Sequence, residues 1–466
     1  MSKSLRRLAH LFLLAFALVA GGSGYWGLIS RDALVTRQDN PRAVLAEEEI
    51  HQGQIVDRNQ RPLVVSMPSP ARPDIYIRQT LYPETAPVVG FYSITHGTGG
   101  VESAFETTLH GDRFVTPLDG WLDSLLHRSQ VGGDVQLTIS LPVQQAARQA
   151  LNGRRGAIVV LNAASGDVLA LDSLPTYDPN TLDTTWDSLR ADPAAPLLNR
   201  ATQALYQPGS VLQAVILGEA VNSRTLQPDD AWNGPSAANF SSGMLPCTIE
   251  PAEQPMTYAA AFEWGCPGPF QALGARMGLP NLRIAADDFG LDEAPRFDLP
   301  VAASPSLPPE GDPTTAAIGQ GQLTVTPLHM ALVAAAFANH GQMPAPRLVS
   351  AIRPPSQGWT PLASPDTPRG TISAASADVI KGLMRDTVVS GAAGAASQPG
   401  RDIYGHAGLA LAGPGRVFNT WFIGFTYSDD HTPIAVAILL ENTRDVPAIS
   451  RIGGLLLAET AAVVDK

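Results

Sequence analysis

One apolar segment near the N-terminus constrains this chain of 466 residues most strongly. Residues 8–29 contain a single ionisable side chain, His10, in an otherwise apolar run. Twenty-two helical residues span about 33 Å, which is enough to cross a bilayer. Because basic residues precede the run, we expect residues 1–7 to remain in the cytoplasm as a short tail. The rest of the chain is then expected outside the cytoplasm.

A cleaved signal peptide is the alternative interpretation of the same segment. Gly21 to Gly24 supply the small residues that such a peptide needs, but no clear Ala-x-Ala site precedes them. We therefore favour an uncleaved, single-pass anchor over residues 8–29.

Charge and composition exclude several classes of protein. The chain has 31 Lys plus Arg against 43 Asp plus Glu, a formal net charge of −12, so it lacks the basic surface of a nucleic-acid-binding protein. Its histidines are scattered and form no HExxH motif, which excludes a zincin. We expect neither a metal nor an organic cofactor. Outside the cytoplasm its two cysteines, Cys247 and Cys266, can form a disulfide. Two buried thiols are the alternative.

The remaining patterns predict a small N-terminal domain followed by a larger α+β domain. Short turn-rich segments are typical of residues 30–130, whereas residues 131–466 combine helices and strands. Strands at both ends of the larger domain, with helices between them, favour a sheet flanked by helices. Residues 174–208 contain five prolines, so we expect a long loop there. The main predicted elements are a hairpin over 156–162 and 167–173, a helix over 210–221, strands over 419–427 and 433–442, and a helix over 448–464.

Several runs follow, in order, the pattern of one known family. They include QGQIVDRNQRPLVVS (52–66), GTGGVESAFETTLHG (97–111) and AIGQGQLTVTPLHMALVAAAFANHG (317–341). The chain resembles the class B penicillin-binding proteins, which are peptidoglycan D,D-transpeptidases of bacterial envelopes. The resemblance implies a pedestal domain (30–130) and a transpeptidase-like penicillin-binding domain (131–466) related to serine β-lactamases.

The same resemblance implies a location and partners. The large domain is expected on the outer side of the bacterial cell membrane, held there by the single anchor. The expected partners are proteins of cell-wall synthesis, such as a polytopic glycosyltransferase.

The first catalytic motif of that family, S-x-x-K, is altered here. The serine attacks a D-alanyl or β-lactam carbonyl, and the lysine one turn away takes its proton. Here the motif reads Ser210-Val211-Leu212-Gln213. The serine is kept, but the amide of Gln213 is not a base near neutral pH, so we expect Gln213 to orient Ser210 without taking its proton. Ser210 has a second interpretation, because a serine after Pro-Gly is a good helix N-cap.

The other two motifs, S-x-N and K-T-G-T/S, are altered as well. The place of S-x-N is taken by Gly265, Cys266 and Pro267, which lack its hydroxyl and amide. The place of K-T-G-T/S is taken by His406-Ala407-Gly408-Leu409, where only the glycine is kept. We expect peptidoglycan stem peptides and β-lactams to bind weakly, if at all.

Three altered motifs in one chain favour a pseudoenzyme, a catalytically lost or impaired transpeptidase that acts through partner contacts. One alternative is an active serine acyl-transferase in which His406 replaces the lysine as base, with Asp402 as a weak candidate for the orienting carboxylate. For His406 itself we favour a solvated strand residue over this role as a base. Cys266 as a substitute nucleophile is disfavoured by its expected pairing with Cys247. A further alternative is a sensor that binds muropeptides or β-lactams without turning them over.

Overall fold

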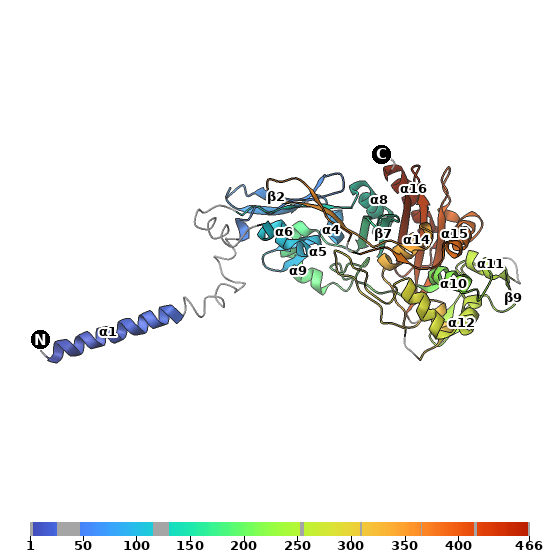
Figure 1. Ribbon diagram of the computed structural model, residues 1–466, viewed down its shortest axis with the longest axis horizontal. Coiled ribbons are helices and arrows are strands. Elements are labelled where there is room, and N and C mark those ends of the chain that lie inside the picture. Colours follow the sequence, from blue (N-terminus) through green and yellow to red (C-terminus); the bar gives the residue numbers. More distant parts are fainter. Residues whose placement is uncertain are drawn as a thin grey trace.

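The computed structural model describes residues 3–25, 47–114, 130–251, 256–307, 310–364, 366–413 and 417–464. Helix α1 (Lys3–Gly24) stands apart from a body of two parts (Figure 1). It is long and apolar enough to cross a membrane, and its apolar window buries nothing against the body. The end of the predicted anchor and the start of the predicted pedestal lie outside the described residues.

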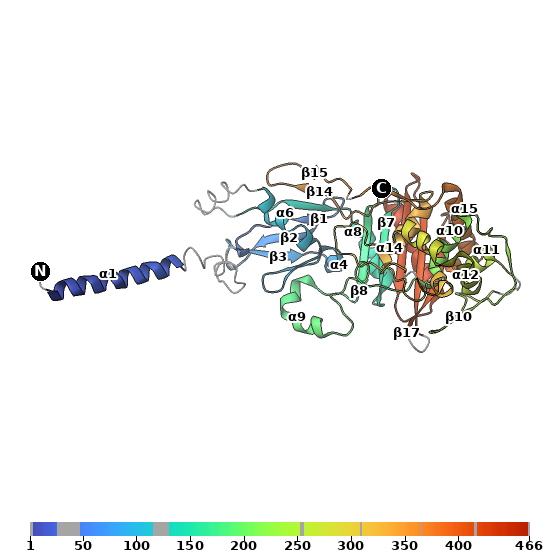
Figure 2. The same ribbon diagram turned by 60° about the horizontal axis from the view of Figure 1, so that its bottom comes forward.

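The part nearer α1 is built on a six-stranded sheet in the order β15-β14-β6-β1-β2-β3. Strands β1 and β6 pair in parallel, and the other neighbours pair antiparallel. Figure 2 shows this sheet between α1 and the larger part of the body. The strands are β1 (Ile55–Val56), β2 (Pro62–Pro68), β3 (Tyr76–Thr80), β6 (Asp134–Leu137), β14 (Val349–Arg353) and β15 (Thr360–Pro361).

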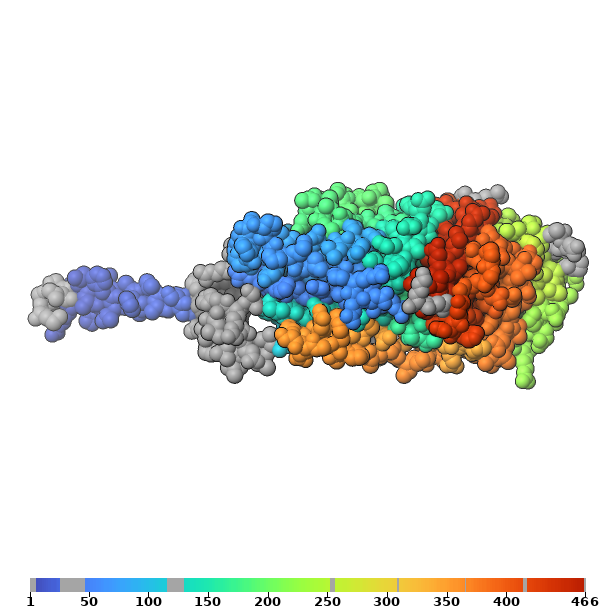
Figure 3. All heavy atoms as spheres, turned by 90° about the horizontal axis from the view of Figure 1, so that it is seen from above, coloured from blue at the N-terminus to red at the C-terminus, as the bar shows by residue number. Residues whose placement is uncertain are grey.

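This sheet crosses the domain boundary predicted at residue 130. Its strands β6, β14 and β15 come from the segment assigned to the transpeptidase-like domain. Ile55 pairs with Val135, and Val135 pairs in turn with Ile352. Such pairing over nearly 300 residues has no local sequence signature, so a boundary drawn from composition misses it. In the space-filling view the segment around residue 350 lies along the pedestal (Figure 3).

The larger part is organised around an antiparallel sheet in the order β17-β18-β19-β7-β8. The predicted hairpin is present as the two neighbouring strands β7 and β8, and both predicted C-terminal strands are present as β18 and β19. The strands are β7 (Gly156–Asn162), β8 (Val168–Leu174), β17 (Tyr404–Gly413), β18 (Val417–Tyr427) and β19 (Pro433–Leu440).

Helices cover both faces of this sheet, as strand alternation shows. Phe422 of β18 faces α16 (Val446–Val464), where a Cβ added to Gly453 would lie 2.2 Å from its ring. Tyr427, an odd number of residues further on, faces α14 (Pro327–Ala338) and donates a hydrogen bond to the Ala338 carbonyl at 2.8 Å. Helix α16 is also apolar enough to span a membrane, but 56% of its window is buried. It is therefore a core helix.

One predicted loop is wrong in part. Residues 174–208 contain the helix α9 (Leu182–Ala191). The five prolines of this segment leave residues 180–192 free of proline, which is long enough for a helix of ten residues.

Candidate active site

Ser210 lies in a tight turn, η5 (Gly209–Leu212), directly before helix α10 (Gln213–Asn222). The turn approaches strand β17 so closely that a Cβ on Gly209 would lie 2.1 Å from the Leu409 carbonyl oxygen. Gly209 also has a φ of +57°, so only glycine fits this position without strain. The turn thus holds Ser210 against the strand that carries the third motif.

The N-cap interpretation of Ser210 is wrong. The residues that precede the two helical segments are Pro208 and Leu212, and neither segment has a side-chain cap. The Ser210 hydroxyl instead donates a long hydrogen bond, 3.5 Å, to the Leu409 carbonyl oxygen. Ser210 lies inside the helical segment η5 rather than before it, so its hydroxyl does not cap the first turn and contacts β17 instead.

Gln213 occupies the lysine position of the first motif as the first residue of α10. Its side chain is fully buried, and neither its amide nitrogen nor its amide oxygen has a hydrogen-bond partner among the described residues. A buried amide without partners destabilises a fold by about 1–3 kcal/mol. Gln213 therefore neither relays a proton nor orients Ser210 through a hydrogen bond.

His406 projects from β17 beside Ser210, as the resemblance implies, and its interpretation as a solvated strand residue is wrong. Its ring is fully buried and stacks on Phe262 of α11 (Tyr258–Glu263), with centroids 4.1 Å apart. Its Nε2 lies 3.1 Å from the backbone carbonyl oxygen of Ser210. A carbonyl can only accept, so Nε2 carries the proton in this bond. Burial lowers the pKa of His406 to about 4, so the ring is neutral at pH 7.

The structure does not assemble a Ser–His–Asp arrangement from these residues. His406 binds the Ser210 carbonyl rather than its hydroxyl, and its Nδ1 has no partner. Asp402 pairs instead with Arg385 at 2.6 Å, at an exposed position where 64% of the Asp402 side chain is accessible. The carboxylate considered for orienting the imidazole is therefore committed elsewhere.

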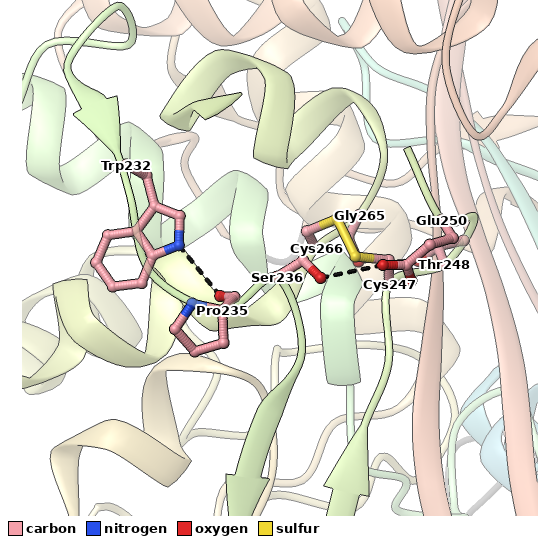
Figure 4. Close-up of a disulfide and its surroundings, with 8 residues drawn as sticks. All are labelled: Trp232, Pro235, Ser236, Cys247, Thr248, Glu250, Gly265 and Cys266. Carbon is pink, nitrogen blue, oxygen red and sulfur yellow. Dashed lines mark hydrogen bonds between the residues drawn. A yellow bond between two sulfur atoms is a disulfide. The ribbon is translucent and has the colours of Figure 1, made fainter. Parts of the chain in front are cut away.

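The second motif is closed by the predicted disulfide between Cys247 and Cys266 (Figure 4). Cys266 is fully buried, and Pro267 begins helix α12 (Pro267–Asp288). The disulfide removes Cys266 as a nucleophile, because the thiolate is the reactive form.

The disulfide also holds the segment around Thr248 against Gly265 of the second motif. Thr248 donates its backbone N–H to the Gly265 carbonyl oxygen at 3.0 Å. A Cβ on Gly265 would lie 2.2 Å from Thr248 Oγ1 and 3.4 Å from the Ala407 carbonyl oxygen. The second motif, the third motif and the segment around Thr248 are thus packed together.

Apart from His406, the third motif carries no polar side chain. Ala407, Gly408 and Leu409 pair across the sheet with Phe422, Trp421 and Thr420. Gly408 is needed for packing, because a Cβ there would lie 2.7 Å from the backbone nitrogen of Val211. The close approach of strand and turn therefore requires glycine at position 408, whatever the chemistry of its neighbours.

Together these contacts exclude solvent from the site. Ser210, Gln213 and His406 all have no exposed surface. Sequence reasoning missed the residues that close it, Phe262 and Thr248. Phe262 lies four residues before Cys266, and this nearness in the chain is the sequence feature that points to it. Within the described ranges, no group of three or more His, Cys, Asp or Glu side chains could hold a metal ion.

Comparison with known proteins identifies the family of this chain. The penicillin binding protein transpeptidase domain matches residues 156–459. The peptidoglycan D,D-transpeptidase PbpA of Mycolicibacterium smegmatis is 32% identical, over 98% of this chain and 97% of its own length. The chain belongs to the class B penicillin-binding proteins.

Solved structures of penicillin-binding proteins share this fold. Penicillin-binding protein A from M. tuberculosis, solved as an imipenem acyl-enzyme complex, is 29% identical with a TM-score of 0.80, covering 90% of this chain and 100% of that one. The D,D-transpeptidase domain of a peptidoglycan glycosyltransferase from Eggerthella lenta is 26% identical with a TM-score of 0.79, covering 89% and 99%. These matches include the mixed α+β transpeptidase fold predicted for this chain.

The packing between Gly408 and Val211 predicts a position-specific loss of stability in this penicillin-binding protein. Gly408→Ala forces a methyl group against the Val211 backbone nitrogen. We expect the free energy of unfolding to fall by about 1–3 kcal/mol, as overpacking does in other cores. Urea denaturation of the detergent-solubilised chain measures it. Gly413→Ala, on the same strand with nothing within 4 Å, is the matched control. Equal losses in both variants would contradict the close approach of strand and turn.

Burial of His406 predicts a dependence of stability on pH. Its pKa is about 4 in the folded chain against an ordinary value of 6.5 for histidine, so the unfolded chain binds more protons between these values. The stabilisation is complete above about pH 6.5 and is lost as the pH falls toward 4. From pH 6.5 to pH 5 we expect the free energy of unfolding to fall about 1.5 kcal/mol more in the wild type than in His406→Asn.

The difference in stability between the wild type and His406→Asn reports on the titration of His406 alone. Burial also lowers the pKa of His329, but His329 is present in both proteins and its contribution cancels. Parallel stability curves for the two proteins over this pH range would show that His406 is not held in its neutral form.

Proposed function

We propose that this class B penicillin-binding protein takes part in peptidoglycan synthesis as a non-catalytic member that acts through protein contacts. Its relatives are named peptidoglycan D,D-transpeptidases, which supports a role in the same process. The loss of acyl-transfer activity is inferred from the environment of Ser210 in this chain.

The observation that carries the proposal is the environment of the Ser210 hydroxyl. A serine is a weak nucleophile unless a base takes its proton. The hydrogen-bond partner of this hydroxyl is a peptide carbonyl, which is not a base. Gln213 has no basic nitrogen, and the Nε2 of His406 is bound to a carbonyl. Ser210 therefore has neither a proton acceptor nor a path for a substrate in this conformation.

The sensor alternative is disfavoured by the same site. Stem peptides and β-lactams carry a carboxylate, which the lysine of the third motif binds in the family. With a pKa of about 4, His406 is uncharged at pH 7 and offers that carboxylate no cation. The buried, disulfide-held second motif leaves such a ligand no room.

We assign the contacts to the membrane and the outer surface. Helix α1, whose apolar window is wholly exposed, is proposed as a single-pass anchor with its basic end in the cytoplasm. Proteins of cell-wall synthesis, such as a polytopic glycosyltransferase, are the proposed partners. In this arrangement the large domain lies on the outer side of the bacterial membrane.

The acylation test is direct. We expect the full chain in detergent, incubated with excess penicillin G, to show no covalent adduct by intact-mass measurement, because the Ser210 hydroxyl has no base. Penicillin-binding protein A from M. tuberculosis is the positive control, since its acyl-enzyme complex with penicillin G has been solved. Ser210→Ala is the matched negative control. An adduct on the wild type that is missing from Ser210→Ala would overturn the proposal.

A genetic measurement tests the role in contacts. In cells that lack the protein, the wild type and Ser210→Ala are expected to restore growth and cell shape equally. A chain whose α1 is replaced by a cleavable signal peptide is expected to restore neither. Failure of Ser210→Ala alone would show that the hydroxyl is used.

A further inference from the structure

A cavity of 560 Å³ lies where the pedestal meets the larger part, away from Ser210. It is formed by three separate stretches of chain: residues 86–104 of the pedestal, residues 173–203 after β8, and residues 297–300. Its volume is typical of a site for a small organic ligand. Exposed residues such as Ser103 and Gln203 line it, so the cavity is open to solvent.

Aromatic rings from all three stretches line the cavity: Phe91, Tyr177 and Phe297. Phe91 and Tyr177 meet edge to face with centroids 5.9 Å apart, which fixes their orientation across the junction. Such rings offer flat apolar faces for a ligand that has a matching apolar face.

The polar groups of the cavity are hydroxyls and amides without any basic side chain. Asp298 is its one carboxylate, and an oxygen of that group already accepts the backbone N–H groups of Leu348 and Val349 at 2.9 and 3.0 Å. An anionic ligand would find no cation here, and binding it would bury an unpaired charge.

Two hydroxyl groups of the lining lack partners. Thr202 is 1% exposed, and its Oγ1 has no hydrogen-bond partner among the described residues. Tyr177 has no hydrogen bond in the same part of the chain, and burial raises the pKa of its phenol, so it stays a neutral donor. Buried polar groups normally find partners, so the unpaired Thr202 hydroxyl indicates a missing ligand group, and the partly buried Tyr177 hydroxyl can bond the same ligand.

We propose that this cavity binds a neutral saccharide of about two sugar units. A sugar combines an apolar C–H face, which suits the aromatic rings, with hydroxyl and amide groups that pair with Tyr177, Thr202 and their neighbours. The proposal rests on the cavity alone and holds whether or not Ser210 is ever acylated.

The test uses N,N′-diacetylchitobiose as the probe and the full chain in a zwitterionic detergent without a sugar headgroup. Saturation-transfer NMR is expected to detect binding with a roughly millimolar Kd. Ser103→Trp, which fills the cavity from an exposed lining position, is expected to abolish the transfer. Ser188→Trp, the same change at an exposed helical serine outside the lining, is the matched control and is expected to bind like the wild type.

Conservative variants test the chemistry of the site. Tyr177→Phe and Thr202→Val keep the shape of the lining but remove the unpartnered hydroxyls, and each is expected to weaken binding at least threefold. Glucuronic acid, which carries a negative charge, is expected to bind more weakly than the neutral probe. Absence of transfer in the wild type, or equal transfer in Ser103→Trp and Ser188→Trp, would overturn the proposal.

Discussion

The geometry around Ser210 depends on the close approach of the turn η5, which contains Ser210, to the edge strand β17. The approach is possible because glycine stands on both sides of it. A Cβ on Gly209 would collide with the Leu409 carbonyl oxygen, and a Cβ on Gly408 would collide with the backbone of Val211. Backbone therefore meets backbone, and the strand is held against the start of helix α10. The position of Ser210, the burial of His406 and the exclusion of water all follow from this contact.

The same contact determines which side chains the site tolerates. A lysine at position 213 or 406 would bring a charge into a fully buried site, where charged groups need water or an ionic partner. Gln213 and His406 are neutral at pH 7 and can be enclosed, although Gln213 leaves both amide atoms unpaired and His406 leaves its Nδ1 unpaired. A neutral side chain at each of these two positions is therefore physically linked to the burial of the site. A lysine at either position would need water or an ionic partner, which the packing around Ser210 does not provide.

Local patterns predicted much of the fold but not its long-range pairing. The hairpin β7–β8 and helix α16 follow from hydrophobic spacing and turn residues within each segment. The pairing of Ile55 with Val135 depends instead on contacts between distant segments, so the sheet of the pedestal was not foreseen. At the site, the resemblance to the family implied that His406 lies beside Ser210. It could not predict which Ser210 oxygen His406 binds, because the stacking of His406 on Phe262 sets that geometry.

Side-chain hydrogen bonds join the pedestal to the larger part of the body. The Asn180 side chain bonds both the N–H and the carbonyl of Thr80, each at 2.9 Å, so it joins the pedestal sheet like a further strand residue. Asn199 donates to the Pro87 carbonyl oxygen at 2.8 Å. Because these bonds fix the relative positions of the two parts, the cavity between them is preformed. A ligand there contacts both parts at once, whereas a ligand at Ser210 would first have to separate the strand from the turn.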